Sequence, residues 1–125
     1  MDKIIKLSRL GKTWILDLDG TMVIHNGYLN NGKDEFLSGA KAFLQAIPNS
    51  DLVVFVTSRK KEYAELTEAF LKENGIRYDS IIYGAPYGER ILINDKKPSG
   101  LTTALAVNTE RDIFCEVSFE IDDLL

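Results

Sequence analysis

Short apolar runs alternate with amphipathic stretches along this chain, and the alternation predicts strands separated by helices. The apolar runs cover residues 13–18, 51–56, 80–83 and 90–93, and they are rich in Ile, Val and Leu. Residues 38–47 and 60–74 carry apolar side chains at helical spacing. The strand runs are apolar throughout rather than at alternate positions, which favours a parallel sheet with helices on both faces. The pattern therefore predicts an α/β protein, a Rossmann-like three-layer sandwich with a central parallel sheet.

Two further regions are predicted from local signals. Asn26 and Gly27 stand between apolar residues, and this dipeptide is a strong signal for a β-hairpin turn. A small hairpin flap over residues 22–33 is therefore expected directly after the first strand. A short helix is expected over 101–107. Residues 111–125 fit either a strand or a helix.

Composition narrows the class of protein. The 125 residues suit a single domain, 1–125, and the net charge of -4 is unlike that of a protein that binds duplex nucleic acid. Cys115 is the only cysteine, so no intrachain disulfide can form, and it is expected to be a small buried residue. The start of the chain is too mixed for a signal peptide, and no apolar run reaches membrane-spanning length. A cytoplasmic protein without nucleic-acid or membrane partners is expected.

Polar side chains follow three of the predicted strands at the points where these end. They are Asp17 and Asp19, then Thr57 and Ser58, then Asn94 and Asp95. Ligands of parallel α/β sheets bind outside the carboxyl ends of the strands, so these side chains are expected to converge. Two neighbouring carboxylates repel each other unless a cation or a shared proton relieves the charge. The convergence predicts a site for Mg²⁺ and a phosphate.

These residues resemble the motifs of the haloacid dehalogenase (HAD) superfamily of Mg²⁺-dependent phosphohydrolases. Its first motif, an apolar strand followed by Asp-x-Asp-Gly-Thr, is matched by residues 17–21. Its second motif, a strand ending in Thr or Ser, is matched by 53–57, and its fourth, a strand ending in an acid, by 91–95. The resemblance covers residues 13 to about 108. It implies a HAD-like fold and phosphatase activity on phosphomonoesters.

The resemblance also implies a role for each matched residue. Asp17 would be the nucleophile that forms an aspartyl-phosphate, and Asp19 the general acid and base. Mg²⁺ would be held by Asp17, the backbone carbonyl of Asp19 and Asp95, with Asn94 beside them. Carboxylate attack on a phosphoryl group requires the charge on both to be neutralised, which Mg²⁺ would do.

The same resemblance implies which groups would bind the phosphate, and it shows one position at which this sequence differs from the family pattern. Thr57 would hydrogen-bond the phosphate, and the backbone N–H groups of Leu18, Asp19 and Ser58 would cradle it. The third motif of the family is a lysine or arginine, but Ala85 stands at the expected position. The side chains that could replace this cation or contact the substrate are Arg59, Arg90, Lys96 and Lys97.

The spacing of the motifs leaves no room for a cap domain, so the expected site is capless and open. An open site suits a large phosphorylated substrate, or a homo-oligomer that completes its wall. A sugar phosphate of polysaccharide or nucleotide-sugar metabolism is expected by analogy with small capless relatives. The alternative is a non-catalytic module that binds metal or phosphate, or serves as an interaction domain. A receiver-type signalling domain is disfavoured, because its acid pair is not followed by Asp-Gly-Thr and a hairpin.

Overall fold

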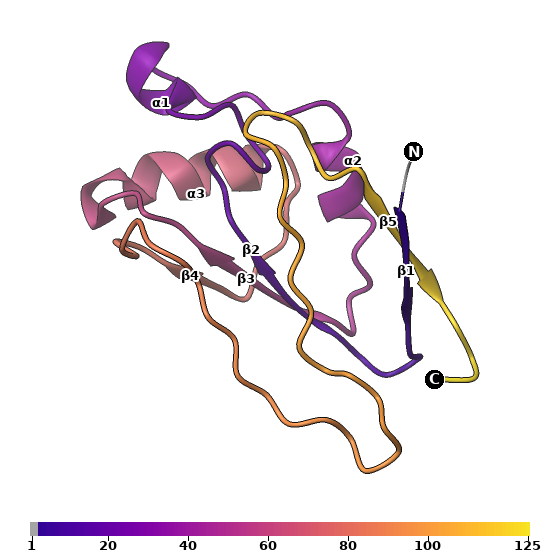
Figure 1. The fold of residues 1–125 in the computed structure, drawn as a ribbon. Coiled ribbons are helices and arrows are strands. Elements are labelled where there is room, and N and C mark those ends of the chain that lie inside the picture. Colours follow the sequence, from indigo (N-terminus) through magenta and orange to yellow (C-terminus); the bar gives the residue numbers. More distant parts are fainter. Residues whose placement is uncertain (1–2) are drawn as a thin grey trace.

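The apolar runs of the sequence form a three-stranded parallel sheet. In the computed structural model, which describes residues 3–125, the strand order is β2 (Thr13–Leu16), β3 (Leu52–Val56) and β4 (Ser80–Ile82) (Figure 1). Leu16 lies opposite Phe55 in the β2–β3 pair, and Val53 and Phe55 of the central strand are buried. The expectation of an α/β protein with an open parallel sheet is confirmed at this level.

A second sheet joins segments from the two ends of the described chain. β1 (Lys3–Leu7) pairs in parallel with β5 (Val117–Ile121), and Ile5 lies opposite Phe119. The Phe119 ring meets Trp14 of β2 edge-on, with 5.2 Å between ring centroids. The tail over 111–125 therefore contains a strand, which was one of its two expected forms, whereas the strand at residues 3–7 was not predicted.

Helices pack where the periodicity predicts them. α2 (Ala40–Gln45) lies within 38–47, and a 3₁₀ turn, η1 (Lys61–Tyr63), leads into α3 (Ala64–Glu73) within 60–74. Buried Thr67 and Leu71 form the inner face of α3, and Gly75 follows its end with a φ of 68°. Every helix among residues 3–125 is too short or too polar to span a bilayer.

The predicted hairpin is wrong. The segment instead contains a one-turn helix, α1 (Gly27–Asn30), and Val23 at its start forms two isolated bridges, a parallel one with Asp19 and an antiparallel one with Phe36. A two-residue type I′ hairpin turn needs positive φ at both central residues. Asn26 has a φ of 56°, but Gly27 does not lie in the positive region and starts the helical turn. We call residues 24–37 the flap loop.

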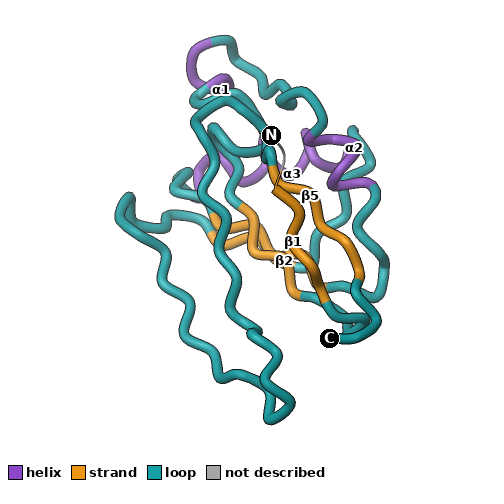
Figure 2. The backbone as a smooth tube through the Cα atoms, turned by 45° about the vertical axis from the view of Figure 1, so that its right-hand side comes forward, coloured by secondary structure: helices purple, strands orange, loops and turns teal. Residues whose placement is uncertain are grey.

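The strand expected at 90–93 and the helix expected at 101–107 are also absent from the structure. Residues 83–116 contain neither a helix nor a strand. They form a long excursion from the end of β4 (Figure 2). Ile91 and Ile93 have exposed fractions of 82% and 90%. An apolar run becomes a strand only when a neighbouring strand accepts its backbone hydrogen bonds. Within residues 3–125 this run pairs with no strand, although β2 is an edge strand of the three-stranded sheet.

The core lies between the three-stranded sheet and the helices. It is formed by apolar side chains of the strands, the helices and the turn after β2, including Leu18, Val23, Leu44, Phe55 and Leu71. Phe43 of α2 and Trp14 pack on this cluster from its edge. The turn that follows β2 is thus anchored in the core, and this fixes the acidic residues on either side of Leu18.

Candidate active site

A tight turn holds the acidic pair at the carboxyl end of β2. The Leu18 carbonyl accepts hydrogen bonds from the N–H groups of Thr21, Met22 and Val23, at 3.2, 2.9 and 3.1 Å. Gly20 has a φ of 79°, a conformation that side chains with a Cβ rarely adopt. The Asp-x-Asp-Gly-Thr sequence therefore folds into one closed turn, with Asp17 and Asp19 at its start.

Asp17 lies in the more open of the two positions. Its Oδ2 accepts a hydrogen bond from the Thr21 hydroxyl at 2.9 Å, and its Oδ1 pairs with Arg90 Nη1 at 2.9 Å. The side chains of Asp17 and Arg90 are 34% and 39% exposed. An ion pair this exposed contributes at most about 1 kcal/mol, so a ligand can displace Arg90 at little cost. Arg90 is thus the cation that the structure places on Asp17.

Asp19 is held by a buried arginine. Arg59 donates from Nε to Asp19 Oδ2 at 2.9 Å and from Nη2 to Asp19 Oδ1 at 3.0 Å. The Arg59 side chain is 1% exposed, and that of Asp19 is 15% exposed. Burial lowers the pKa of Arg59, but its hydrogen bonds to Asp34 and Asp19 outweigh this and hold the pKa above its ordinary value. Arg59 is therefore a charged partner of Asp19, buried below the surface.

A second carboxylate, which the sequence did not single out, completes this cluster. Asp34 of the flap loop accepts from Arg59 Nη1 at 2.9 Å and from Nη2 at 2.6 Å. Thr67 of α3 accepts from Nη1 at 2.9 Å. The ring of Tyr28 covers the guanidinium, with 3.9 Å between Cζ and the ring centroid. No local pattern around Asp34 indicates this role, because its partner lies 25 positions away.

The predicted phosphate-binding groups gather where β2 and β3 end. Thr57 is fully buried, and its Oγ1 accepts the Arg59 N–H at 3.1 Å. Within residues 3–125, no hydrogen-bond acceptor is found for the backbone N–H groups of Leu18, Asp19 and Ser58. Buried backbone N–H groups are nearly always paired, and Leu18 is only 2% exposed. These three N–H groups are available to an anion.

The third predicted pair of residues, Asn94 and Asp95, lies away from the acidic turn. Asn94 and Asp95 are exposed in the excursion, and Asn94 Nδ2 donates to Thr103 Oγ1 at 2.7 Å. The neighbouring Lys96 and Lys97 are also exposed. In the part of the chain that is described, no cluster of three or more His, Cys, Asp or Glu side chains is positioned to bind a metal. Asp17 and Asp19 are thus the carboxylates that remain for a metal.

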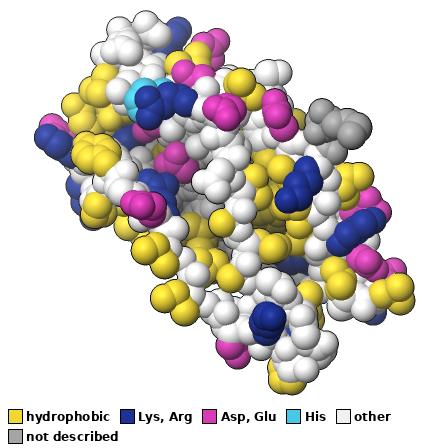
Figure 3. All heavy atoms as spheres, viewed as in Figure 1, with side chains coloured by type: hydrophobic (Ala, Val, Ile, Leu, Met, Phe, Trp, Pro, Cys, Tyr) yellow, Lys and Arg dark blue, Asp and Glu magenta, His cyan; other side chains and the backbone are white. Residues whose placement is uncertain are grey.

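The end of the excursion returns to the acidic turn. The Asp112 N–H donates to the Gly20 carbonyl at 2.8 Å, and Asp112 Oδ1 accepts the His25 N–H at 2.7 Å. A Cβ on Gly20 would stand 3.2 Å from Arg111 Cγ. Residues 111–112 therefore brace the turn. Over the face seen in Figure 3, charged side chains of both signs are interspersed.

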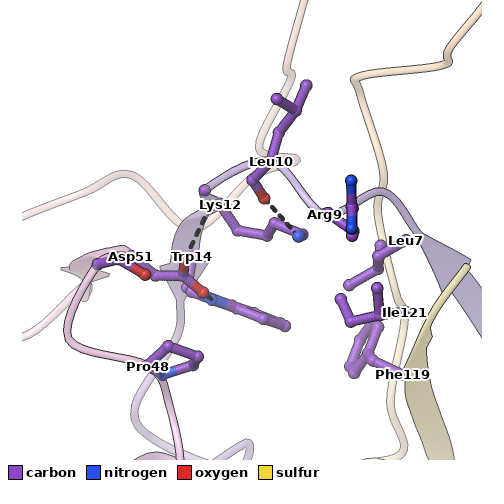
Figure 4. A pocket seen from close by; sticks show the side chains of 11 residues that line it. Leu7, Arg9, Leu10, Lys12, Trp14, Pro48, Asp51, Phe119 and Ile121 are labelled. Carbon is purple, nitrogen blue, oxygen red and sulfur yellow. Dashed lines mark hydrogen bonds between the residues drawn. The ribbon is translucent and has the colours of Figure 1, made fainter. Parts of the chain in front are cut away.

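A cavity of about 400 Å³ lies at the opposite end of β2 (Figure 4). It is lined mainly by apolar side chains, among them Leu7, Trp14, Phe119 and Ile121. The Trp14 indole N–H donates to Asp51 Oδ2 at 2.9 Å, so the principal polar groups here are paired with each other. Lys12 Nζ donates to the carbonyls of Ser8 and Leu10. Among the residues that line this cavity Asp51 is the one acid, so it has no acid pair like that of Asp17 and Asp19.

Comparison with known proteins identifies one structural neighbour. No protein-family model matches the chain, and no curated protein matches it significantly. A chain of the "Structure of Pnkp1/Rnl/Hen1 complex" is similar, with 28% sequence identity and a TM-score of 0.51. The match covers 66% of this chain and 31% of the neighbour, so the chain spans under a third of that protein.

These findings correct the family expected from the sequence. The assignment to the HAD superfamily is contradicted, because no family model matches and the structural neighbour is not specific to that superfamily. The match to Asp-x-Asp-Gly-Thr involves only a few residues, which was not enough to identify the family. The strand expected to carry the fourth motif does not form.

Proposed function

We propose that this chain is a Mg²⁺-dependent phosphatase that hydrolyses a phosphomonoester through an aspartyl-phosphate on Asp17. The observation that carries the proposal is the set of free N–H groups of Leu18, Asp19 and Ser58, which lie in the same region at the ends of β2 and β3 as the partly exposed carboxylate of Asp17. Backbone N–H groups arranged in this way bind the oxygens of a phosphate. Asp17 then stands next to the bound phosphorus as a nucleophile.

The charges around Asp17 favour this chemistry. Arg90 neutralises the carboxylate in the absence of substrate and is exposed enough to move onto a phosphate oxygen. Mg²⁺ binds proteins through one or two carboxylates together with substrate phosphate and water, and Asp17 with the Asp19 carbonyl fits that donor set. When bound, the ion would offset the negative charge of the phosphoryl group. Asp95 would join this set only if the excursion rearranged.

Asp19 is suited to proton transfer. In the first step the protonated form of Asp19 would give its proton to the leaving oxygen of the ester, and in the second the resulting carboxylate would take a proton from the water that attacks the aspartyl-phosphate, which restores the protonated form. Both of its oxygens accept from Arg59, but each carboxylate oxygen has a second lone pair. Its exposed fraction of 15% leaves one side open to a substrate.

The proposal also covers the finer fold class, the substrate, the location and the oligomeric state. The sheets and helices fit a Rossmann-like three-layer arrangement, and the open acidic turn suits a phosphorylated sugar or a larger phosphorylated substrate. A cytoplasmic protein that forms homo-oligomers would agree with the single cysteine and the uncapped site. The competing function is a non-catalytic phosphate-binding module. It is favoured by the positions of Asn94 and Asp95, which lie in the excursion and add no ligand to the acidic turn.

The experiment measures phosphate release from a panel of phosphomonoesters with Mg²⁺ and with EDTA. The matched pair is Asp17→Asn and Asp123→Asn, the latter an acid that is 74% exposed and paired with Arg9. Phosphatase activity predicts turnover that requires Mg²⁺, disappears in Asp17→Asn and persists in Asp123→Asn. Phosphate binding without turnover of any ester would establish the binding module. Turnover that survives Asp17→Asn would refute the proposed nucleophile.

A further inference from the structure

We infer that Asp34 and Arg59 are positioning residues, which fix the carboxylate of Asp19 for proton transfer and tie the flap loop to it. The inference rests on the proposed function, because it assigns a purpose to the buried charges behind the proton-transferring acid. It also means that Arg59 does not contact the substrate, although the sequence had suggested Arg59 as a substrate contact.

The guanidinium of Arg59 has no donor left for a ligand. An arginine side chain carries five N–H donors and no acceptor. The five hydrogen bonds of Arg59 are two to Asp19, two to Asp34 and one to Thr67, at 2.6 to 3.0 Å. Tyr28 covers a face of the group. A phosphate could reach Arg59 only by displacing one of these buried partners.

The arrangement fixes Asp19 in position and direction. Two parallel N–H···O bonds set both the place and the plane of a carboxylate, which a single lysine ammonium would not do. Arg59 is oriented in turn by two hydrogen bonds that it donates to Asp34, whose side chain is 1% exposed. Of the three charged groups, Asp19 alone has a side chain more than 1% exposed. The cluster therefore presents one oriented carboxylate to the site.

A purely stabilising role does not account for two carboxylates on one cation. Buried ion pairs lose much of their attraction to desolvation and are often no more stable than apolar replacements. This cluster also carries one net negative charge below the surface. Holding reacting groups within a fraction of an ångström is what such supporting contacts provide to a site. Because Asp34 belongs to the flap loop, the position of that loop is coupled to the orientation of Asp19.

Two esters with different leaving groups test this role. An alkyl phosphate needs a proton on its leaving oxygen, whereas 4-nitrophenyl phosphate leaves as a stabilised anion and depends little on a general acid. We expect Asp34→Asn to lower kcat on the alkyl ester about 10- to 100-fold with KM unchanged, and to lower kcat on the nitrophenyl ester much less. Asp19→Asn should show the same pattern. The double variant should lose no more than Asp19→Asn, because both changes remove one function.

Matched variants keep the test decisive if Asp34→Asn folds poorly. Glu35→Gln changes an exposed acid on the same loop and should leave both activities unaltered. Thr67→Val removes an acceptor of Arg59 and should reproduce the selective loss on the alkyl ester, while Thr67→Ser retains the hydroxyl and should restore activity. Equal losses on both esters would overturn the positioning role and leave the phosphatase standing. A wild-type protein that cleaves neither ester would refute the proposed function and this inference together.

Discussion

Arg59→Met removes the cation from the buried cluster and should strongly destabilise the protein. The change removes five hydrogen bonds. It leaves both carboxylate oxygens of Asp34, whose side chain is 1% exposed, without the donors of Arg59. Breaking a buried ion pair by deleting one partner costs about 3–5 kcal/mol. Domains of this size have about 5–15 kcal/mol of unfolding free energy in total. We therefore expect a folded but marginal variant.

Urea unfolding measures this loss. With an m value of about 1–3 kcal/mol/M, the urea midpoint of Arg59→Met should fall by at least about 1 M. The matched control is Arg9→Met, which removes the arginine of a pair that is 75% and 74% exposed, with 3.6 Å between the charged atoms. Such a pair contributes about 0–1 kcal/mol, so the control should unfold almost as the wild type does.

A further variant separates the lost charge from the lost packing. Asp34→Leu in the Arg59→Met background removes the uncompensated carboxylate, and it should recover part of the stability. If Arg59→Met costs no more than Arg9→Met, the buried cluster does not anchor the flap loop and the argument from burial fails. If the double variant is less stable than Arg59→Met, the isolated charge of Asp34 is not the source of the loss.

Three other outcomes follow from the structure. Gly20→Ala should cost about 1–2 kcal/mol in thermal or urea unfolding because of its positive φ, whereas Gly88→Ala, with open space and no positive φ, should be nearly neutral. Ile93→Ser should change the unfolding free energy by less than about 0.5 kcal/mol, since Ile93 is exposed, and a loss several times larger would place it in a buried strand. Burial and a hydrogen bond to Glu68 raise the pKa of Tyr83, so its contribution to stability is complete below the ordinary tyrosine pKa of about 10 and is lost as pH rises above that value. Unfolding curves of Tyr83→Phe should accordingly depend less on alkaline pH than those of the wild type, and an equal dependence would exclude Tyr83 as the cause.

Local sequence patterns predicted the strands and helices that bury an apolar face. The runs that became β2, β3 and β4 are apolar enough to require a covered sheet, and α3 shows its buried face through Leu71 and its neighbours. The pattern failed at Asn26–Gly27, because only one of the two residues adopts the positive φ that the turn requires. It also failed at 90–93, where an apolar run stays unpaired although the sheet has edge strands on both sides.

Contacts between distant residues could not be predicted in the same way. The pairing of β1 with β5 joins positions more than a hundred residues apart, and the mixed sequence of 3–7 gives no sign of it. For the candidate site, the sequence singled out Asp17, Asp19 and Thr57 from their places after apolar runs. It did not find Asp34, because a lone acid in a polar loop looks the same whether it is solvated or paired with a buried arginine.

The most direct test of the account is to look for a phosphoryl group on Asp17. The protein is mixed with Mg²⁺ and a cleavable phosphomonoester, quenched in acid during turnover, digested and examined by mass spectrometry. The account predicts that the peptide containing residues 13–21 gains the mass of one phosphoryl group, which localises to Asp17 and is absent in Asp17→Asn and without Mg²⁺. Turnover with no phosphoryl group on this peptide, or with one on another residue, would contradict it.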